Sequence, residues 1–147
     1  MSAIHSVVIG GTRGTGRAVV RSLAKEGHTV SVVGRRAPEK QDTEIPSVSH
    51  WSTDLLDEAQ TSKTWNEIVQ KQGPLHNLVF CQQYRGTGNR WEGELETSLS
   101  ATKSAIESLA PHFNKDSQGS ITVISSASGR FITEEQPVGY HVVKAGL

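Results

Sequence analysis

The chain has 147 residues, of which 35% are hydrophobic, so it can bury one core, and we expect a single domain spanning residues 1–147. The 15 Lys and Arg residues balance the 15 Asp and Glu residues, which leaves no overall charge to favour nucleic acid or an anionic membrane as a partner. The single cysteine, Cys81, excludes an internal disulfide framework, and no apolar run is long enough for a signal peptide or a membrane span, so we expect a cytoplasmic protein.

Predicted strands and helices alternate along the chain. Short apolar or β-branched runs predict strands over residues 5–9, 29–33, 48–51, 75–80 and 120–124. Apolar residues at helical spacing predict helices over residues 17–26, 57–72 and 94–113 and from Tyr140 onward, with a loop of little or no helix over residues 37–46. Since strands separated by helices form parallel sheets, we predict an α/β protein. It is a Rossmann-type, doubly wound parallel sheet with strand order 3-2-1-4-5 between two helical layers.

A glycine-rich turn joins the first predicted strand to the first predicted helix. Gly10, Gly14 and Gly16 stand in the spacing G-x-x-x-G-x-G. Glycines let the backbone turn sharply and approach a ligand, and the following helix directs its first N–H groups and its positive dipole end at that ligand. A phosphate fits such a site. The other residues of the turn that we expect at the phosphate are Thr12, Arg13 and Thr15.

Two other glycine patterns fit this stretch less well. The dinucleotide pattern G-x-G-x-x-G would need a glycine where Val19 stands. Gly11 and Gly16 have the separation found in a P-loop. They are followed, however, by Arg17 and Ala18, where that loop needs Lys and Ser or Thr. The remaining alternative is that the turn is only a tight connection between a strand and a helix.

Polar residues follow the second and third predicted strands. Arg35 and Arg36 stand where an NAD-binding protein has an acidic residue for the ribose 2′-hydroxyl, and Arg13 can approach from the glycine turn. Guanidinium groups suit a 2′-phosphate, so NADP(H) is the expected cofactor and NAD(H) is less favoured, unless these arginines are only solvated loop residues. Asp54 and Leu55 are expected at the adenine, unless Asp54 only caps the next helix.

The last part of the chain carries side chains suited to proton transfer. Tyr140 and Lys144 are four residues apart and share one face of a helix. A free tyrosine has a pKa of about 10, and bringing it near neutrality takes roughly 4 kcal/mol, which a neighbouring ammonium helps to supply by favouring the phenolate. Tyr140 can then donate a proton to a carbonyl oxygen as hydride arrives. Ser126, or Ser125 in its place, would hydrogen-bond that oxygen; the alternative is that Tyr140 and Lys144 are structural.

The order of these motifs resembles that of the classical short-chain dehydrogenase/reductases. The glycine turn comes first, Ser125-Ser126 follows the fifth strand, and Tyr140 and Lys144 come last. The likeness runs from the first strand to the last residues. It implies hydride transfer between a nicotinamide and a small-molecule carbonyl or secondary alcohol.

The resemblance also assigns positions between these motifs. Counting between Trp91 and Pro111 places Ser98 at the position of the family's catalytic Asn, where a hydroxyl can still hold a relay water. Phe80-Cys81-Gln82-Gln83 replaces the family's Asn-Asn-Ala-Gly, and Gln82 is expected beside the cofactor. Family members continue into further strands that supply a substrate lid and much of an oligomer interface. We therefore expect a fragment of a longer reductase that forms a homodimer or homotetramer at full length.

Two functions follow from these residues. The first is an NADP(H)-dependent carbonyl reductase or alcohol dehydrogenase with Tyr140 as general acid and base. The second is a catalytically weak dinucleotide-binding sensor or scaffold, motivated by Ser98 and by the Phe80-Cys81-Gln82-Gln83 segment. A sugar epimerase of the extended family is disfavoured, because its glycine spacing would need glycines at Arg13 and Arg17. The histidines lack metal-ligand spacing, so no metal is expected.

Overall fold

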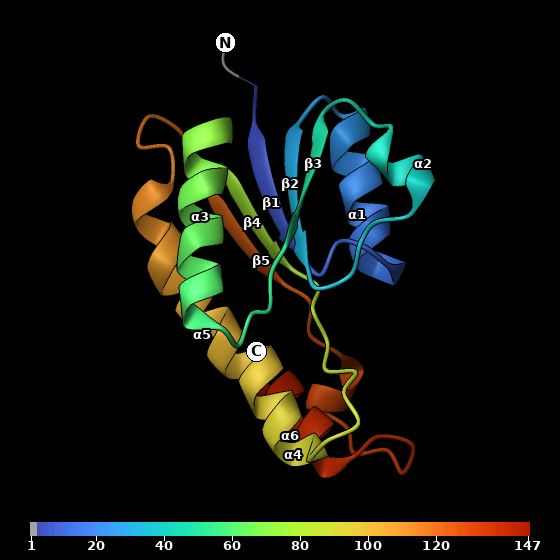
Figure 1. Ribbon diagram of the computed structural model, residues 1–147. Helices are drawn as coiled ribbons and strands as arrows, with labels where there is room; N and C mark the ends of the chain where they lie inside the picture. Colours follow the sequence, from blue (N-terminus) through green and yellow to red (C-terminus); the bar gives the residue numbers. More distant parts are fainter. Residues whose placement is uncertain (1–2) are drawn as a thin grey trace.

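The computed structural model describes residues 3–147, and its centre is a five-stranded parallel sheet (Figure 1). The strand order is β3-β2-β1-β4-β5, which confirms the predicted order and fold class. The strands are β1 (His5–Ile9), β2 (Thr29–Gly34), β3 (Val48–Ser52), β4 (Asn77–Phe80) and β5 (Ser120–Val123). β4 begins later than predicted, because Leu75 pairs with Phe113 in an isolated parallel bridge before the ladder begins.

Helices cover both faces of this sheet (Figure 1). On one face lie α1 (Gly14–Lys25) and the short α2 (Lys40–Thr43). On the other face lie α3 (Glu58–Gln72) and α5 (Ala101–Leu109). The three-layer arrangement agrees with the prediction, and α2 is the only helix in the described residues between β2 and β3.

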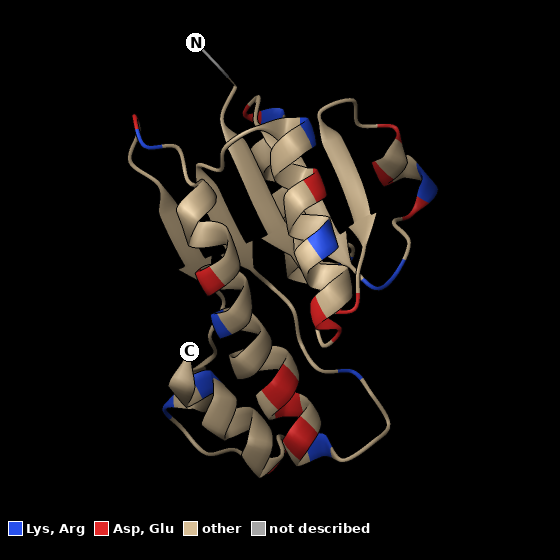
Figure 2. Ribbon diagram, turned by 60° about the vertical axis from the view of Figure 1, so that its left-hand side comes forward, with Lys and Arg blue, Asp and Glu red and all other residues tan. Residues whose placement is uncertain are grey.

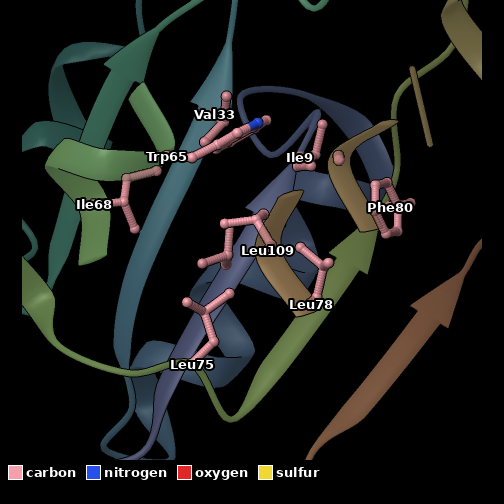
Figure 3. Close-up of a cluster of buried hydrophobic side chains, with 10 residues drawn as sticks. Ile9, Val33, Trp65, Ile68, Leu75, Leu78, Phe80 and Leu109 are labelled. Carbon is pink, nitrogen blue, oxygen red and sulfur yellow. The ribbon is translucent and has the colours of Figure 1, made fainter. Parts of the chain in front are cut away.

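The core has two halves because side chains alternate between the faces of a strand. Val8 of β1 packs toward α1, whereas Val7 and Ile9 pack toward α3 and α5. The second half is the larger and is completed by Trp65, Ile68, Leu75, Leu78, Phe80 and Leu109 (Figure 3). Each of these fully buried side chains contributes roughly 1.5–3 kcal/mol, which makes the sheet a rigid support for what lies at its carboxyl ends.

One long helix follows β4 in four consecutive segments. They are α4 (Arg90–Glu94), the π-helical η1 (Leu95–Ser100), α5 and the 3₁₀ turn η2 (Ala110–His112). The predicted start at residue 94 is wrong, because Asn89 caps the helix earlier. Its side-chain oxygen accepts hydrogen bonds from the backbone N–H groups of Trp91 at 3.0 Å and Glu92 at 3.4 Å. Pro111 lies in the 3₁₀ turn, so the α-helical part ends before it, as predicted.

The segment after β5 folds back against the beginning of the long helix. It contains the 3₁₀ turn η3 (Ala127–Gly129) and α6 (Val138–Gly146), which begins two residues earlier than predicted. α6 lies beside α4 at the end of the molecule where the strands finish (Figure 1). A Cβ atom at Gly139 would lie 3.4 Å from the Trp91 Cα, in ordinary van der Waals contact, so the two helices lie directly against each other. None of the helices in residues 3–147 is long and apolar enough to cross a membrane.

An ion-pair network ties α2 to α1. The Asp42 carboxylate is 4% exposed and lies 2.7 Å from the Arg17 Nε and 2.7 Å from the Arg21 Nη2. Arg17 also contacts Glu39 at 2.7 Å. Charged residues of α2 are visible at the right of Figure 2. Because α2 follows directly on the loop after β2, this network fixes the far end of the loop that carries Arg35 and Arg36.

Candidate cofactor and active site

A cavity of about 340 Å³ opens where the carboxyl ends of the strands meet. Its walls come from the glycine turn, from the segments after all five strands and from α6. All the predicted cofactor residues line it: Gly10, Thr12, Arg13, Gly14, Thr15, Gly16, Arg35, Arg36, Asp54, Leu55 and Gln82. Tyr140 and Lys144 line the same cavity. The fold thus brings together residues that are up to 134 positions apart in the sequence, counted from Gly10 to Lys144.

The glycine turn lies directly against the end of β4. A side chain at Gly10 would come within 2.5 Å of the Gln82 backbone nitrogen, and one at Gly16 would overlap the Gly10 carbonyl. Gly14 has a φ of +49°, which is left-handed backbone that favours glycine. Arg13 precedes α1 in extended conformation and makes no side-chain cap. The first N–H groups of α1 therefore remain available at the cavity for an anion.

Four arginines line the cavity: Arg85 follows β4, and the other three lie around the glycine turn and the end of β2. Arg13 comes from the glycine turn, and Arg35 and Arg36 come from the loop after β2. All three are exposed, and no carboxylate within residues 3–147 forms an ion pair with any of them. Their guanidinium groups are therefore free to bind an anionic group at this part of the cavity.

The two aspartates between β3 and α3 have different roles. Asp57 caps α3, because its carboxylate accepts a hydrogen bond from the Gln60 backbone N–H at 2.9 Å. The hydrogen bonds from Gln60 hold the pKa of Asp57 below its usual range. The alternative that Asp54 caps this helix is therefore wrong. Asp54 instead lies at the cavity wall and accepts a hydrogen bond from the Leu56 backbone N–H at 3.1 Å.

Tyr140 and Lys144 are adjacent on α6. The Lys144 Nζ lies 5.6 Å from the centre of the Tyr140 ring and donates a hydrogen bond to the Ile124 carbonyl at 2.7 Å. Lys144 is only 7% exposed, and this burial lowers its pKa, while the charges of Glu94 and Cys81 oppose that effect. The ammonium is held in one place by the end of β5, next to the phenol.

The serines expected beside this pair occupy different positions. Ser125 lines the cavity, and its hydroxyl donates to the Lys144 carbonyl at 2.6 Å. Ser126 lies outside the described lining, and its Oγ accepts a hydrogen bond from the Ser128 backbone N–H at 3.2 Å to cap η3. Ser98 is also outside the lining and is buried beneath it in η1, where its Oγ has no hydrogen-bond partner among residues 3–147. The roles of these three serines stay predictions.

Gln82 links the end of β4 to the long helix. Its Nε2 donates hydrogen bonds to the Thr102 Oγ1 at 2.7 Å and to the Thr97 carbonyl at 3.4 Å. The amide therefore supports the wall of the cavity at a place where the family's usual residues are replaced. Its neighbour Cys81 is half-buried, and burial raises the pKa of the thiol, which keeps it a poor nucleophile.

Several residues at or beside the cavity were not found from the sequence, among them Tyr84, Arg85 and Thr97 in its lining and Glu94 beside it. Tyr84 lines the cavity, and its ring covers Gly93 so closely that a side chain there would overlap it. The glycines at positions 86, 88 and 93 around this tyrosine were a usable signal for such a close approach. Glu94 is completely buried beside α6, for which the helical pattern carried no sign. No group of three His, Cys, Asp or Glu side chains in residues 3–147 could hold a metal ion.

Comparison with known proteins identifies the family. Residues 5–147 match the family model described as short chain dehydrogenase. The chain belongs to this family of oxidoreductases. The match begins at β1 and extends through α6, so every wall of the cavity lies inside it.

Similar curated short-chain dehydrogenases include two 3-oxoacyl-[acyl-carrier-protein] reductases. MabA of Mycobacterium avium is 28% identical over 150 residues, and FabG of Staphylococcus aureus is 24% identical over 156 residues. The alignments cover 96% and 97% of this chain but 56% and 63% of the relatives, so the chain spans about three fifths of their length. Glycine betaine reductase ATRR of Emericella nidulans is 26% identical over 143 residues, which are 88% of this chain and 11% of that protein.

Solved structures of the family have the same fold. A short-chain dehydrogenase from Streptomyces avermitilis superposes with a TM-score of 0.86 at 21% identity, covering 98% of this chain and 56% of that one. Thermoplasma acidophilum aldohexose dehydrogenase superposes with a TM-score of 0.84 at 20% identity, covering 98% and 57%. These likenesses confirm the Rossmann-type architecture predicted from the sequence.

Proposed function

We propose that this short-chain dehydrogenase uses NADP(H) to reduce a small-molecule carbonyl to a secondary alcohol, or to catalyse the reverse oxidation. The observation that supports this most strongly is that Tyr140 and Lys144 line the same cavity as the glycine turn. The proposed proton donor and the proposed phosphate site therefore face the same cavity. Hydride transfer to a carbonyl requires this, because cofactor, substrate and acid must meet there.

The cavity fits a nicotinamide dinucleotide on three counts. Gly10 and Gly16 leave a cradle that side chains would fill, and the start of α1 is open to a phosphate. Arg35 and Arg36, with Arg13 opposite, supply guanidinium groups for a 2′-phosphate, which favours NADP(H) over NAD(H). Asp54 is suited to accept a hydrogen bond from the adenine amino group. When bound, the cofactor supplies or accepts the hydride.

The proton is handled by α6. The Tyr140 hydroxyl donates a proton to the carbonyl oxygen of the substrate, and the ammonium of Lys144 stabilises the phenolate that is left. Ser126 orients the carbonyl oxygen if its hydroxyl turns away from η3, and Ser125 already lies at the cavity for the same task. We assign the relay water to Ser98, which stands at the position of the family's catalytic Asn.

The first experiment is calorimetric titration with NADPH and then with NADH. We expect NADPH to bind at least tenfold more tightly, and Arg35→Ala/Arg36→Ala to weaken NADPH binding about tenfold to a hundredfold while leaving NADH binding unchanged. Arg130→Ala is the matched control, because that arginine lies outside the cavity lining. Equal binding of the two cofactors by the unaltered protein contradicts the NADP(H) assignment, and binding of neither contradicts the proposed function.

The second experiment measures turnover. NADPH oxidation is followed with ethyl acetoacetate, a 3-oxoacyl ester, as the probe. We expect Tyr140→Phe to lose at least a hundredfold in kcat while its calorimetric affinity for NADPH stays within twofold of the unaltered protein. Tyr84→Phe is the control that keeps the ring at the other tyrosine of the cavity. Equal turnover by Tyr140→Phe rules out the proposed acid and base.

A non-catalytic sensor or scaffold is the second candidate. The observations in its favour are the serine in place of the family's Asn and the engagement of the Ser126 hydroxyl with Ser128. Tight NADPH binding without turnover of a panel of carbonyl compounds supports this candidate and counts against the first.

We also propose that residues 1–147 form one domain and that the protein self-associates as a dimer or tetramer. Exposed apolar side chains at Phe131, Ile132 and Val138 support self-association. Sedimentation equilibrium tests it, and a monomer at all concentrations contradicts it. The cytosolic location is supported by the single cysteine, and fluorescence imaging of the tagged protein in its own cell tests it.

A further inference from the structure

A buried carboxylate that takes no part in the proposed chemistry lies at the junction of α4 and η1. Glu94 is 0% exposed, and neither of its carboxylate oxygens receives a hydrogen bond from any group in residues 3–147. Figure 2 shows acidic residues gathered along this part of the long helix. Two of them, Glu92 and Glu96, are exposed, so Glu94 differs from its neighbours in being enclosed.

An ion pair within the helix does not account for this burial. The Arg90 Nε lies 4.0 Å from the Glu94 Oε1, and the Arg90 side chain is 60% exposed. A pair of this kind at helical spacing contributes about 0.3–0.5 kcal/mol. Enclosing a carboxylate without hydrogen bonds costs several times as much, so an apolar side chain would make the junction more stable.

The carboxylate faces α6 rather than the sheet. A Cβ atom at Gly139 would lie 3.5 Å from the Glu94 Cβ, in ordinary van der Waals contact, so α6 lies directly against this glutamate. Ser98 follows one turn along the long helix, and its Oγ is also buried without a hydrogen-bond partner in the described residues. Glu94 therefore lies between the helix that holds Ser98 and the helix that holds Tyr140 and Lys144.

Charges couple Glu94 to Lys144. Burial raises the pKa of Glu94, while the charges of Arg90 and Lys144 and the neighbouring Ser98 hydroxyl oppose that effect. In return, burial lowers the pKa of Lys144, and the largest opposing effect is that of the Glu94 charge, followed by that of Cys81. Each of the two buried groups stabilises the charged form of the other.

We propose that Glu94 is a positioning residue that acts through Lys144: across the junction of α4 and α6, its buried carboxylate supplies the opposite charge for the buried ammonium that stands beside the Tyr140 phenol. The inference rests on the proposed function only in treating Tyr140 and Lys144 as the reacting pair. The other titratable groups facing this junction are Arg90 on the same helix, Cys81 at the end of β4, Tyr84 against Gly93 and Tyr140 on α6. Among the groups that act on the pKa of Lys144, the Glu94 carboxylate has the largest raising effect, so removing it leaves burial opposed by the smaller effect of Cys81.

The test is a titration of Lys144 by NMR with lysine labelled at Cε, in the absence of any cofactor or substrate. The resonance is assigned by its loss in Lys144→Arg. We expect Glu94→Gln to make Lys144 lose its proton at a lower pH, so that the neutral fraction at pH 8.5 rises about threefold or more. Glu94→Asp is expected to restore part of the original behaviour, because it keeps the charge.

Glu96→Gln is the matched control, with the same chemical change two residues away on the exposed side of the helix. We expect it to leave the Lys144 titration unaltered. An unaltered titration in Glu94→Gln overturns the proposal, and so does an equal change in Glu96→Gln. If Glu94→Gln does not fold, Glu94→Leu decides, since an apolar side chain suits this enclosed position and also removes the charge. An unaltered Lys144 titration in Glu94→Leu likewise overturns the proposal.

Thermal unfolding separates this role from a purely structural one. A positioning role predicts that Glu94→Gln unfolds at the same temperature or higher, because a neutral amide is less costly to bury. A lower unfolding temperature together with an unaltered Lys144 titration means that Glu94 is structural. Since no NADPH is present in these measurements, a failure of the proposed cofactor binding leaves their result unaffected.

Discussion

Two glycines of the turn before α1 are required for different physical reasons. Gly14 has a left-handed φ of +49° with no atom within 4 Å of the position a side chain would take. Gly16 has ordinary backbone, but a side chain there would overlap the carbonyl of Gly10. The first position is limited by backbone conformation and the second by space, so the same substitution has different consequences at the two positions.

We expect Gly16→Ala to abolish NADPH binding and Gly14→Ala to retain most of it. In Gly14→Ala the strain costs about 1–2 kcal/mol of stability and leaves the cavity open. In Gly16→Ala the Gly10 carbonyl must move, which distorts the phosphate site. Urea unfolding and calorimetry measure both effects, with Gly88→Ala as a control in ordinary contact with Tyr84. Normal NADPH affinity in Gly16→Ala contradicts this account of the turn.

The residues that line the cavity around the glycine turn could be predicted one by one. The residues contributed by η3 and α6 could be predicted less completely. Arg35 and Gln82 gather with the glycine turn because parallel strands end at one edge of a sheet, which local sequence patterns reveal. Whether Ser125 or Ser126 faces the cavity depends on side-chain rotation at η3, which no pattern encodes. Glu94 is buried by a helix that comes some forty residues later in the chain. From the sequence alone, a glutamate in a helical pattern is predicted to be exposed.

At the scale of elements, polar side chains decide where helices begin and what they contact. α3 begins at Asp57, which is followed three residues later by Gln60, and the Gln60 Nε2 donates back to the Asp57 carboxylate at 2.8 Å. This exchange resembles a capping box and was readable in the sequence. The Asn89 cap of α4 was harder to recognise, because apolar periodicity becomes clear only at residue 95.

We expect the contribution of Asp57 to stability to depend on pH in the acid range. Its pKa is lowered in the folded protein by hydrogen bonds from Gln60, so the folded state favours the carboxylate. This contribution is fully present above the ordinary aspartate pKa of about 3.9 and is lost as the pH falls below it, through the lower folded value. Urea unfolding of the unaltered protein and of Asp57→Ala at several pH values measures it. The two stabilities should converge in acid, and a constant difference across the series would falsify this reading.

We expect Asp42→Asn to detach α2 from α1. The substitution leaves Arg17 and Arg21 without their shared carboxylate, and because both guanidinium groups are partly exposed the cost is about 1–3 kcal/mol rather than that of a fully buried pair. Glu39→Gln is the control, since that side chain is 55% exposed and its pairing contributes little. Hydrogen exchange of residues 35–44 and thermal unfolding report the change. An equal loss of exchange protection and an equal fall in unfolding temperature in both variants contradict a special role for Asp42.

At the scale of the whole molecule, the two ends of the sheet carry different features. The carboxyl ends of the strands carry the cavity, whereas the amino ends carry a buried polar network around His5. The ring of His5 donates to the Gly73 carbonyl across 3.1 Å and lies 2.8 Å from the Ser31 Oγ. This histidine joins β1 to β2 and to the connection between α3 and β4.

We expect the whole protein to lose stability as the pH falls from about 7.5 to 5.5. Burial lowers the pKa of His5 in the folded state, so below the ordinary histidine value the unfolded chain binds more protons and unfolding is favoured. The contribution is fully present above that value and is lost as the pH falls toward the folded one. His5→Gln should flatten the dependence measured by urea unfolding. His50→Gln should flatten it less, because Asp42 opposes the effect of burial there.

The order of the five strands could be predicted because it follows from alternating strands and helices and a glycine turn after the first strand. The packing of α6 against α4 could not, because residues far apart in the sequence make it. The approach of η3 to α6 depends on the lack of a side chain at Gly129, where a Cβ would lie 2.5 Å from the Lys144 carbonyl oxygen. A glycine in a sequence indicates that another segment can approach closely, but it does not indicate which segment. The sheet was therefore recognisable from local patterns, and the helical end of the cavity was not.

The π-helical segment η1 determines how far α4 is rotated about the helix axis relative to α5. In α5, Ala105 and Leu109 pack against the sheet. In α4, Gly93 contacts the Tyr84 ring and Glu94 faces α6. A π-helical turn holds one residue more than the α-helical turn it replaces, so deleting one residue, such as the exposed Glu96, would rotate α4 by about 100° relative to α5. Gly93 would then turn away from Tyr84 at the cavity wall, and Glu94 would turn away from α6, while the sheet stayed intact. The structure at this end of the molecule therefore depends on the length of one helical segment as well as on its side chains.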